Sequence, residues 1–110
     1  ADCWLVNTGW TGGPYGVGSR MAIGVTRALL TAALEGTLRK QEFVPDPVFG
    51  VLVPQACPGV PAEVLVPRNA WRDKQKYDVQ AKDLAAKFRA NFEQFVGAVA
   101  PEVAAAGPKV

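Results

Sequence analysis

The chain has 110 residues, of which 49% are hydrophobic and 20% are charged, as in ordinary globular domains. This composition fits one small domain or part of a larger one, and it excludes disorder throughout. Twelve basic and ten acidic residues leave a net charge of +2, too small for nucleic-acid binding driven by charge alone. No apolar run reaches the roughly 18 residues that a membrane-spanning helix requires, so we expect no membrane partner.

The residue types also limit the chemistry. The chain contains no histidine, which excludes His-based triads, His metal ligands and imidazole bases within it. Its two cysteines, Cys3 and Cys57, match no metal-ligand spacing and are too few for a disulfide framework. We therefore expect free thiols in a cytoplasmic protein.

Residues 3–6 form a short apolar run whose aromatic and β-branched content favours a buried strand. Residues 9–18 contain five glycines, a density that predicts a loop. Extended structure is predicted to resume over residues 20–23. Thr26 is then a candidate N-cap for a helix over residues 27–35, which is apolar on most sides and therefore suited to a buried position.

Gly36 follows this helix and is well placed to end it in the left-handed conformation. Residues 39–72 contain six prolines, which exclude a long helix there. Two short runs between the prolines, residues 43–44 and residues 51–53, are strand candidates that proline confines to strand ends or sheet edges.

Asp73 is a plausible N-cap for a long helix over residues 74–97. Residues three or four apart mark one apolar face of this helix: Tyr77, Ala81, Leu84, Phe88, Asn91 or Phe92, and Phe95. Opposite charges four residues apart predict three ion pairs on its other faces: Asp78 with Lys82, Asp83 with Lys87, and Arg89 with Glu93. Residues 98–106 are expected to add a final turn or two.

Two features indicate a missing core. The first predicted strand has no partner strand nearby in the sequence. The helix over residues 27–35 has more apolar surface than 110 residues can easily cover. We therefore infer that the rest of the core lies outside this chain.

The glycine-rich stretch is the main candidate for a ligand site. Gly13 begins the spacing of a P-loop, but Ser19 replaces its lysine and Arg20 replaces its metal-binding hydroxyl residue. Gly16 begins a dinucleotide-binding pattern, but Met21 stands at its third glycine position. The spacing leaves two interpretations open, a phosphate site and a plain structural loop.

Arg20 is the most specific residue of this region. A guanidinium after a flexible loop can stack on an aromatic ring or pair with a phosphate. The alternative is an ordinary exposed surface arginine. Residue type alone does not decide between these roles.

Taken as a whole, residues 4–21 (WLVNTGWTGGPYGVGSRM) closely resemble a glycine-rich segment of the ATP-dependent phosphoenolpyruvate carboxykinases. The resemblance continues, in order, through residues 26–29, 58–61, 67–69, 91–92 and 107–109. It thus spans nearly the whole chain. One departure is Ser19, where many relatives carry lysine, which puts any charge contribution from this position in doubt.

The resemblance implies a fold of the α/β class, with mixed helices and strands. The chain would be the C-terminal portion of a larger mononucleotide-binding domain. Residues 1–38 would form a strand, the Gly-rich loop and a helix, residues 39–72 a proline-rich connection with short strands, and residues 73–110 the long C-terminal helix and tail.

The resemblance also implies an activity. The family converts oxaloacetate and ATP to phosphoenolpyruvate, CO2 and ADP in gluconeogenesis, using Mg²⁺ with ATP and a second ion, often Mn²⁺. Residues of the family that match Arg20, Met21 and Thr26 contact the nucleotide near its adenine.

The family's P-loop, metal ligands and oxaloacetate-binding arginine are expected upstream, in the remainder of the same polypeptide. This chain is therefore expected to hold no catalytic residue and no metal ligand, and to be inactive alone. A hypothesis from another class is a stand-alone, non-catalytic interaction module that binds a nucleotide or another anion.

Overall fold

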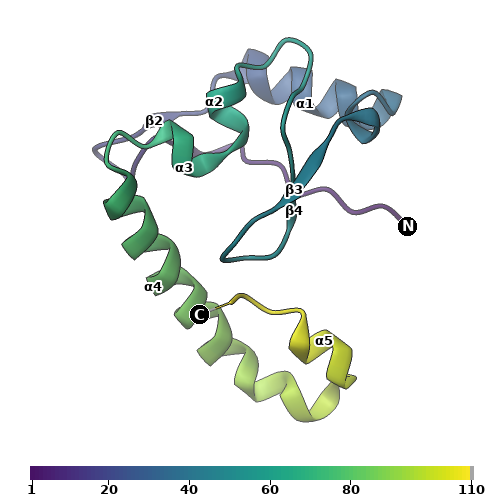
Figure 1. The fold of residues 1–110 in the computed structure, drawn as a ribbon, viewed down its shortest axis with the longest axis vertical. Coiled ribbons are helices and arrows are strands. Elements are labelled where there is room, and N and C mark those ends of the chain that lie inside the picture. The colour runs from purple at the N-terminus through teal and green to yellow at the C-terminus, as the bar shows by residue number, and fades with distance from the viewer. Residues whose placement is uncertain (110) are drawn as a thin grey trace.

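The computed structural model describes residues 1–109, which form helices and two small antiparallel sheets, a mixed α/β arrangement (Figure 1). The fold class predicted from the sequence is confirmed. In chain order the elements are β1 (Trp10–Thr11), β2 (Ser19–Arg20), α1 (Ile23–Glu35), η1 (Leu38–Lys40), β3 (Phe43–Pro45), β4 (Leu52–Pro54), α2 (Ala62–Leu65), α3 (Pro67–Ala70), α4 (Lys74–Phe92), η2 (Glu93–Ala98) and α5 (Pro101–Ala105).

Both sheets are two-stranded hairpins. In the first, β1 pairs with β2, so that Trp10 lies opposite Arg20. In the second, β3 pairs with β4, and Val44 lies opposite Val53. The predicted strands over residues 43–44 and 51–53 are therefore confirmed, with prolines at the strand ends, where a missing N–H is tolerated.

The strand predicted for residues 3–6 does not form. A strand requires a partner to satisfy its N–H and C=O groups, and no other segment of residues 1–109 pairs with this one. The Trp4 ring packs instead against Phe43, with ring centroids 6.1 Å apart. Residues 3–6 have the apolar pattern of a strand, but the described part of the chain supplies no partner strand.

The helix α1 begins earlier than predicted. Its N-cap is Ala22, in an extended conformation with φ of −63° and ψ of 136°, and no side chain caps it. The prediction of Thr26 as N-cap is wrong, because the Thr26 N–H donates to the Ala22 carbonyl at 3.1 Å from within the first turn. Of the extended residues predicted over 20–23, only Arg20 belongs to a strand. The chain enters the helix directly after a buried Met21.

The end of α1 agrees with the prediction. Gly36 adopts a left-handed conformation with φ of 82°, which costs glycine little because it lacks a Cβ atom. The next turn, η1, places Leu38 in a small core with Ala32 and Cys57. Arg39 of the same turn forms an ion pair with Asp2 near the N-terminus.

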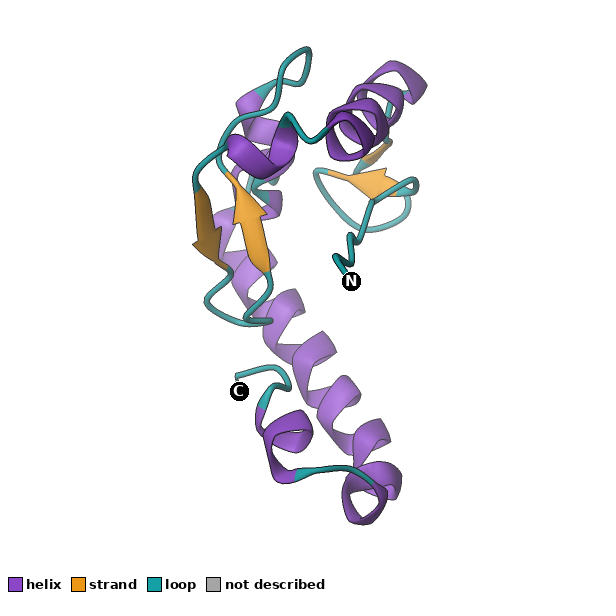
Figure 2. Cartoon of the chain, turned by 90° about the vertical axis from the view of Figure 1, so that its right-hand side faces the viewer, coloured by secondary structure: helices purple, strands orange, loops and turns teal. Residues whose placement is uncertain are grey.

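The long helix α4 was predicted with its cap. The Asp73 side chain accepts a hydrogen bond from the Lys76 N–H at 3.1 Å. Helical structure continues through η2 to Ala98, close to the predicted end at residue 97. The helix α5 then folds back beside α4, as both views show (Figure 1, Figure 2). It supplies the final turn predicted for residues 98–106.

Only one of the three predicted ion pairs of α4 forms among the described residues, namely that of Lys87 with Asp83 at 2.7 Å. Asp78 is bound instead by Arg68 of α3, whose Nε and Nη2 atoms donate to its two carboxylate oxygens at 2.8 and 3.1 Å. The forked geometry of a guanidinium explains this preference over Lys82. Hydrogen bonding from Arg68 lowers the pKa of the Asp78 carboxyl below its usual value.

The buried core of the described residues is small. It contains Met21, Ala32, Leu38, Cys57, Ala81 and Ala85. On α1, by contrast, the apolar side chains of Ile23 and Leu34 are 71% and 87% exposed. The radius of gyration is 15.2 Å, whereas a compact chain of this length has about 13 Å. The segment is thus open and presents apolar surface on several sides.

Both cysteines are free thiols, as the composition predicted. Cys3 is exposed, whereas Cys57 lies in the small core, and burial raises the pKa of its thiol. Among the described helices none has the length and apolar character needed to cross a membrane.

Candidate nucleotide site

The Gly-rich loop connects β1 to β2 and closes on itself. The N–H groups of Val17 and Gly18 both donate to the Pro14 carbonyl, at 3.0 and 2.9 Å. In a phosphate-binding loop such amides point at the anion instead. At these two positions the structure therefore favours the structural interpretation of the loop over the P-loop interpretation.

Gly18 is the tightest point of the loop. A Cβ atom built on it would lie 2.6 Å from the Thr11 carbonyl oxygen and 2.7 Å from the Gly13 nitrogen. These are backbone atoms, which cannot move aside as the tip of a side chain could. A residue without a Cβ atom is therefore required for the two arms of the loop to approach each other.

The base of the loop is held by a side chain that sequence reasoning missed. The Asn7 Oδ1 atom accepts from the Gly9 N–H at 2.8 Å, and its Nδ2 atom donates to the Trp10 carbonyl at 3.0 Å. The Gly9 carbonyl in turn accepts from the Met21 N–H at 2.6 Å. An asparagine two residues before a glycine is a turn signal that could have indicated this arrangement.

The three residues predicted to contact a nucleotide lie close together along the chain at the start of α1. Arg20 ends β2 and is exposed, Met21 is only 8% exposed, and Thr26 is half-buried in the first turn of the helix. Among the described residues, no hydrogen bond or ion pair joins their side chains. They flank one helix end without forming a closed site.

This helix end suits an anionic or π-rich ligand. Arg20 forms no ion pair with any described residue, so its guanidinium can serve a ligand. The first turn of α1 has neither a capping side chain nor an acidic residue. Its unpaired N–H groups therefore keep the partial positive charge of a helix N-terminus. Trp10, which lies opposite Arg20 in the hairpin, meets the Tyr15 ring edge to face, with ring centroids 5.2 Å apart.

The structure has a cavity that borders the Gly-rich region and a larger groove that lies away from it. A cavity of about 500 Å³ is lined by Met21 together with Trp10 and Thr11, but not by Arg20 or Thr26. A larger groove of about 980 Å³ lies between α4, the β3–β4 hairpin and the C-terminal residues. None of the three predicted residues lines that groove.

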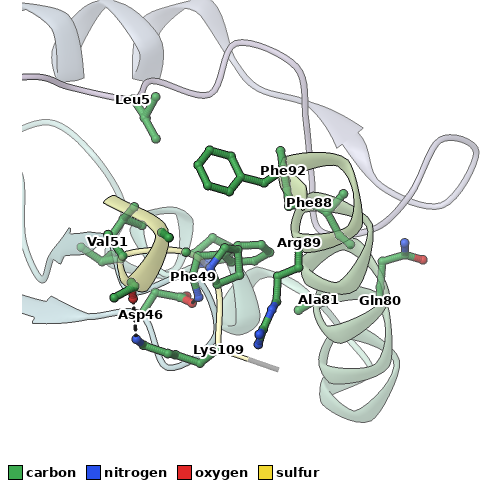
Figure 3. Close-up of a pocket in the computed structure, with 18 of the residues that line it drawn as sticks. Leu5, Asp46, Phe49, Val51, Gln80, Ala81, Phe88, Arg89, Phe92 and Lys109 are labelled. Atoms are coloured by element: carbon green, nitrogen blue, oxygen red, sulfur yellow. Dashed lines mark hydrogen bonds between the residues drawn. The ribbon is translucent and has the colours of Figure 1, made fainter. Parts of the chain in front are cut away.

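The larger groove is lined mainly by apolar side chains, among them Val51, Phe88 and Phe92 (Figure 3). Aromatic rings of Phe49 and Phe88 meet across it, with centroids 6.4 Å apart. The Asp46 carboxylate accepts from the N–H groups of Val48 and Phe49, and the Lys109 N–H donates to the Val48 carbonyl at 2.6 Å. The groove therefore offers mainly apolar contact, with Gln80, Arg89 and Glu93 as further polar side chains in its lining.

A metal site is not formed by the residues that the structure describes. Among residues 1–109, no three Asp, Glu or Cys side chains come together in a group that could hold an ion. By themselves, residues 1–109 therefore do not provide the ligand set that a divalent metal needs.

Comparison with known proteins identifies the family. Residues 1–63 match the phosphoenolpyruvate carboxykinase family. A protein of Geotalea uraniireducens called phosphoenolpyruvate carboxykinase (ATP) is 64% identical over 103 residues, which are 94% of this chain and 19% of that protein. A Moorella thermoacetica protein called phosphoenolpyruvate carboxykinase (ATP) 2 is 59% identical over 100% of this chain and 21% of its own length. A Bradyrhizobium diazoefficiens protein called phosphoenolpyruvate carboxykinase (ATP) is 60% identical over 99% of this chain and 20% of its own length.

The chain therefore belongs to the phosphoenolpyruvate carboxykinase family, and the resemblance seen in the sequence is confirmed. It spans about a fifth of the length of these relatives.

Proposed function

We propose that this chain is part of an ATP-dependent phosphoenolpyruvate carboxykinase, a lyase that converts oxaloacetate and ATP to phosphoenolpyruvate, CO2 and ADP in gluconeogenesis. The observation that carries the proposal is identity of about 60% to proteins of that name over almost the whole chain. Within the enzyme, residues 1–110 would be the C-terminal segment of the nucleotide-binding domain, divided at residues 38 and 72 as the composition suggests.

The proposed role of this segment is to hold the adenine side of ATP. Arg20 would place its planar guanidinium against the base or the nearby sugar and phosphates, which its exposure and lack of an ion pair support. Met21 is only 8% exposed and its N–H donates to the Gly9 carbonyl, so it would offer apolar contact and its carbonyl oxygen rather than its N–H. Thr26, in the first helical turn, would offer its hydroxyl.

The remaining chemistry is assigned to the rest of the same polypeptide. Phosphoryl transfer depends on positioned phosphates, metal ions and cationic side chains, and Mg²⁺ and Mn²⁺ ligands would lie outside this segment. The exposed apolar side chains of α1 and the groove beside α4 support packing against that larger body. The proposed cytoplasmic location follows from the family resemblance.

Substitution of Arg20 tests the assignment. In the full-length enzyme, we expect Arg20→Ala to raise the KM for ATP by about 3- to 30-fold. This is the effect of losing one cation–π contact of about 0.5–2 kcal/mol. The KM for oxaloacetate should stay near its original value, because that substrate binds elsewhere. Steady-state kinetics with each substrate varied in turn gives both values.

A matched control is Arg72→Ala, which removes another exposed arginine that forms no ion pair among the described residues. It should change neither KM. Arg20→Lys, which keeps the charge but loses the planar group, should fall between Arg20→Ala and the unmodified enzyme. Equal increases in both KM values for Arg20→Ala would contradict an adenine-side role.

A further inference from the structure

Asn7 is not one of the residues proposed to hold ATP, but its side chain bonds to the backbone that lies beside them in the β1–β2 hairpin. Its two hydrogen bonds hold the backbone of Gly9 and Trp10, at 2.8 and 3.0 Å. Both bonds lie within four residues, so they fix a local turn and do not join distant elements. A turn of this kind orders a backbone that the neighbouring glycines would otherwise leave free.

The two residues held by Asn7 are the ones that pair with the proposed nucleotide residues. Gly9 donates its N–H to Asn7 and accepts the Met21 N–H at its carbonyl, at 2.6 Å. Trp10 gives its carbonyl to Asn7 and lies opposite Arg20 in the β1–β2 hairpin. The Asn7 side chain thus bonds directly to the two residues, Gly9 and Trp10, that face Met21 and Arg20.

We propose that Asn7 is a positioning residue for ATP binding, which acts by fixing the backbone to which Arg20 and Met21 are attached. The proposal rests on the proposed function of those two residues. Because the β1–β2 hairpin has only two residues in each strand, its pairing alone gives little rigidity. The Asn7 contacts supply order at the end of the hairpin from which Arg20 and Met21 lead into α1.

The experiment uses the full-length enzyme and three variants. Asn7→Ala removes both hydrogen bonds, and we expect the KM for ATP to rise about tenfold, the effect of losing one to two ordinary hydrogen bonds. Asn7→Asp keeps the acceptor for the Gly9 N–H but loses the donor to the Trp10 carbonyl, so it should retain part of the affinity. Thr8→Ala is the matched control, since Thr8 is an exposed neighbour whose side chain makes no hydrogen bond with a described residue.

Two readouts separate positioning from general stability. The kcat and the KM for oxaloacetate should remain unchanged in Asn7→Ala, whereas a general structural defect would alter them together. Hydrogen–deuterium exchange should show faster exchange at the Met21 amide in Asn7→Ala than in Thr8→Ala, because the Gly9 carbonyl that accepts from it is no longer held.

The outcomes also separate this proposal from the proposed function. If Arg20→Ala raises the KM for ATP but Asn7→Ala behaves like Thr8→Ala, the positioning role is wrong and the nucleotide assignment stands. If Asn7→Ala lowers kcat and raises both KM values equally, Asn7 has only a structural role and the proposal is overturned. If Arg20→Ala leaves the KM for ATP unchanged, the proposed function fails first, whatever Asn7→Ala does.

Discussion

Replacing Gly18 with alanine in the full-length enzyme is expected to weaken ATP binding by about 5- to 150-fold, which corresponds to about 1–3 kcal/mol of overpacking strain. The new Cβ atom would lie 2.6 Å from the Thr11 carbonyl oxygen, so the two arms of the loop must separate. Since Thr11 and Ser19 form one of the two β1–β2 pairs, this separation also displaces Arg20.

Calorimetric titration of ATP into the variant measures this effect directly. Gly97→Ala provides the matched control, because a Cβ atom there meets nothing within 4 Å and the residue is far from the loop in the sequence. It should bind ATP as the unmodified enzyme does. Unchanged affinity in Gly18→Ala would show that loop closure does not matter for the nucleotide.

The second large effect is expected when residues 1–110 are produced alone. We expect a broad thermal transition or none, because among residues 1–109 no large side chain is fully buried and α1 exposes Ile23 and Leu34. We also expect no formation of phosphoenolpyruvate from oxaloacetate and ATP, since the P-loop, metal ligands and oxaloacetate-binding arginine of the family are expected in the rest of the polypeptide.

Differential scanning calorimetry and a coupled assay for phosphoenolpyruvate test these expectations, with the full-length enzyme as the positive control. A sharp, cooperative transition would favour the alternative of a stand-alone module. Turnover by the isolated chain would show that the proposed division of roles along the polypeptide is wrong.

Local signals predicted much of this fold. The Asp73 cap, the left-handed Gly36 and the proline-bounded strands β3 and β4 depend on nearby residues, so the sequence pattern was sufficient. The predictions that failed depend on distant partners. Residues 3–6 have the composition of a strand but no strand to pair with, and Asp78 is bound by Arg68 from another helix instead of by Lys82 on its own.

The candidate site shows the same limit. Arg20, Met21 and Thr26 could be named from the family resemblance, but their surroundings could not. Neither spacing nor composition indicated that Met21 would be buried or that the loop amides would bond to Pro14. These are consequences of backbone geometry, which the glycines permit but do not specify.

The position of Arg20 relative to bound nucleotide is the most direct test of the central claim. In a crystal structure of the full-length enzyme with ATP or a non-hydrolysable analogue, we expect the Arg20 guanidinium within about 6 Å of the adenine ring, the range of a cation–π contact. Met21 and Thr26 should border the same nucleotide. An adenosine moiety bound elsewhere, with Arg20 still facing solvent, would contradict the account.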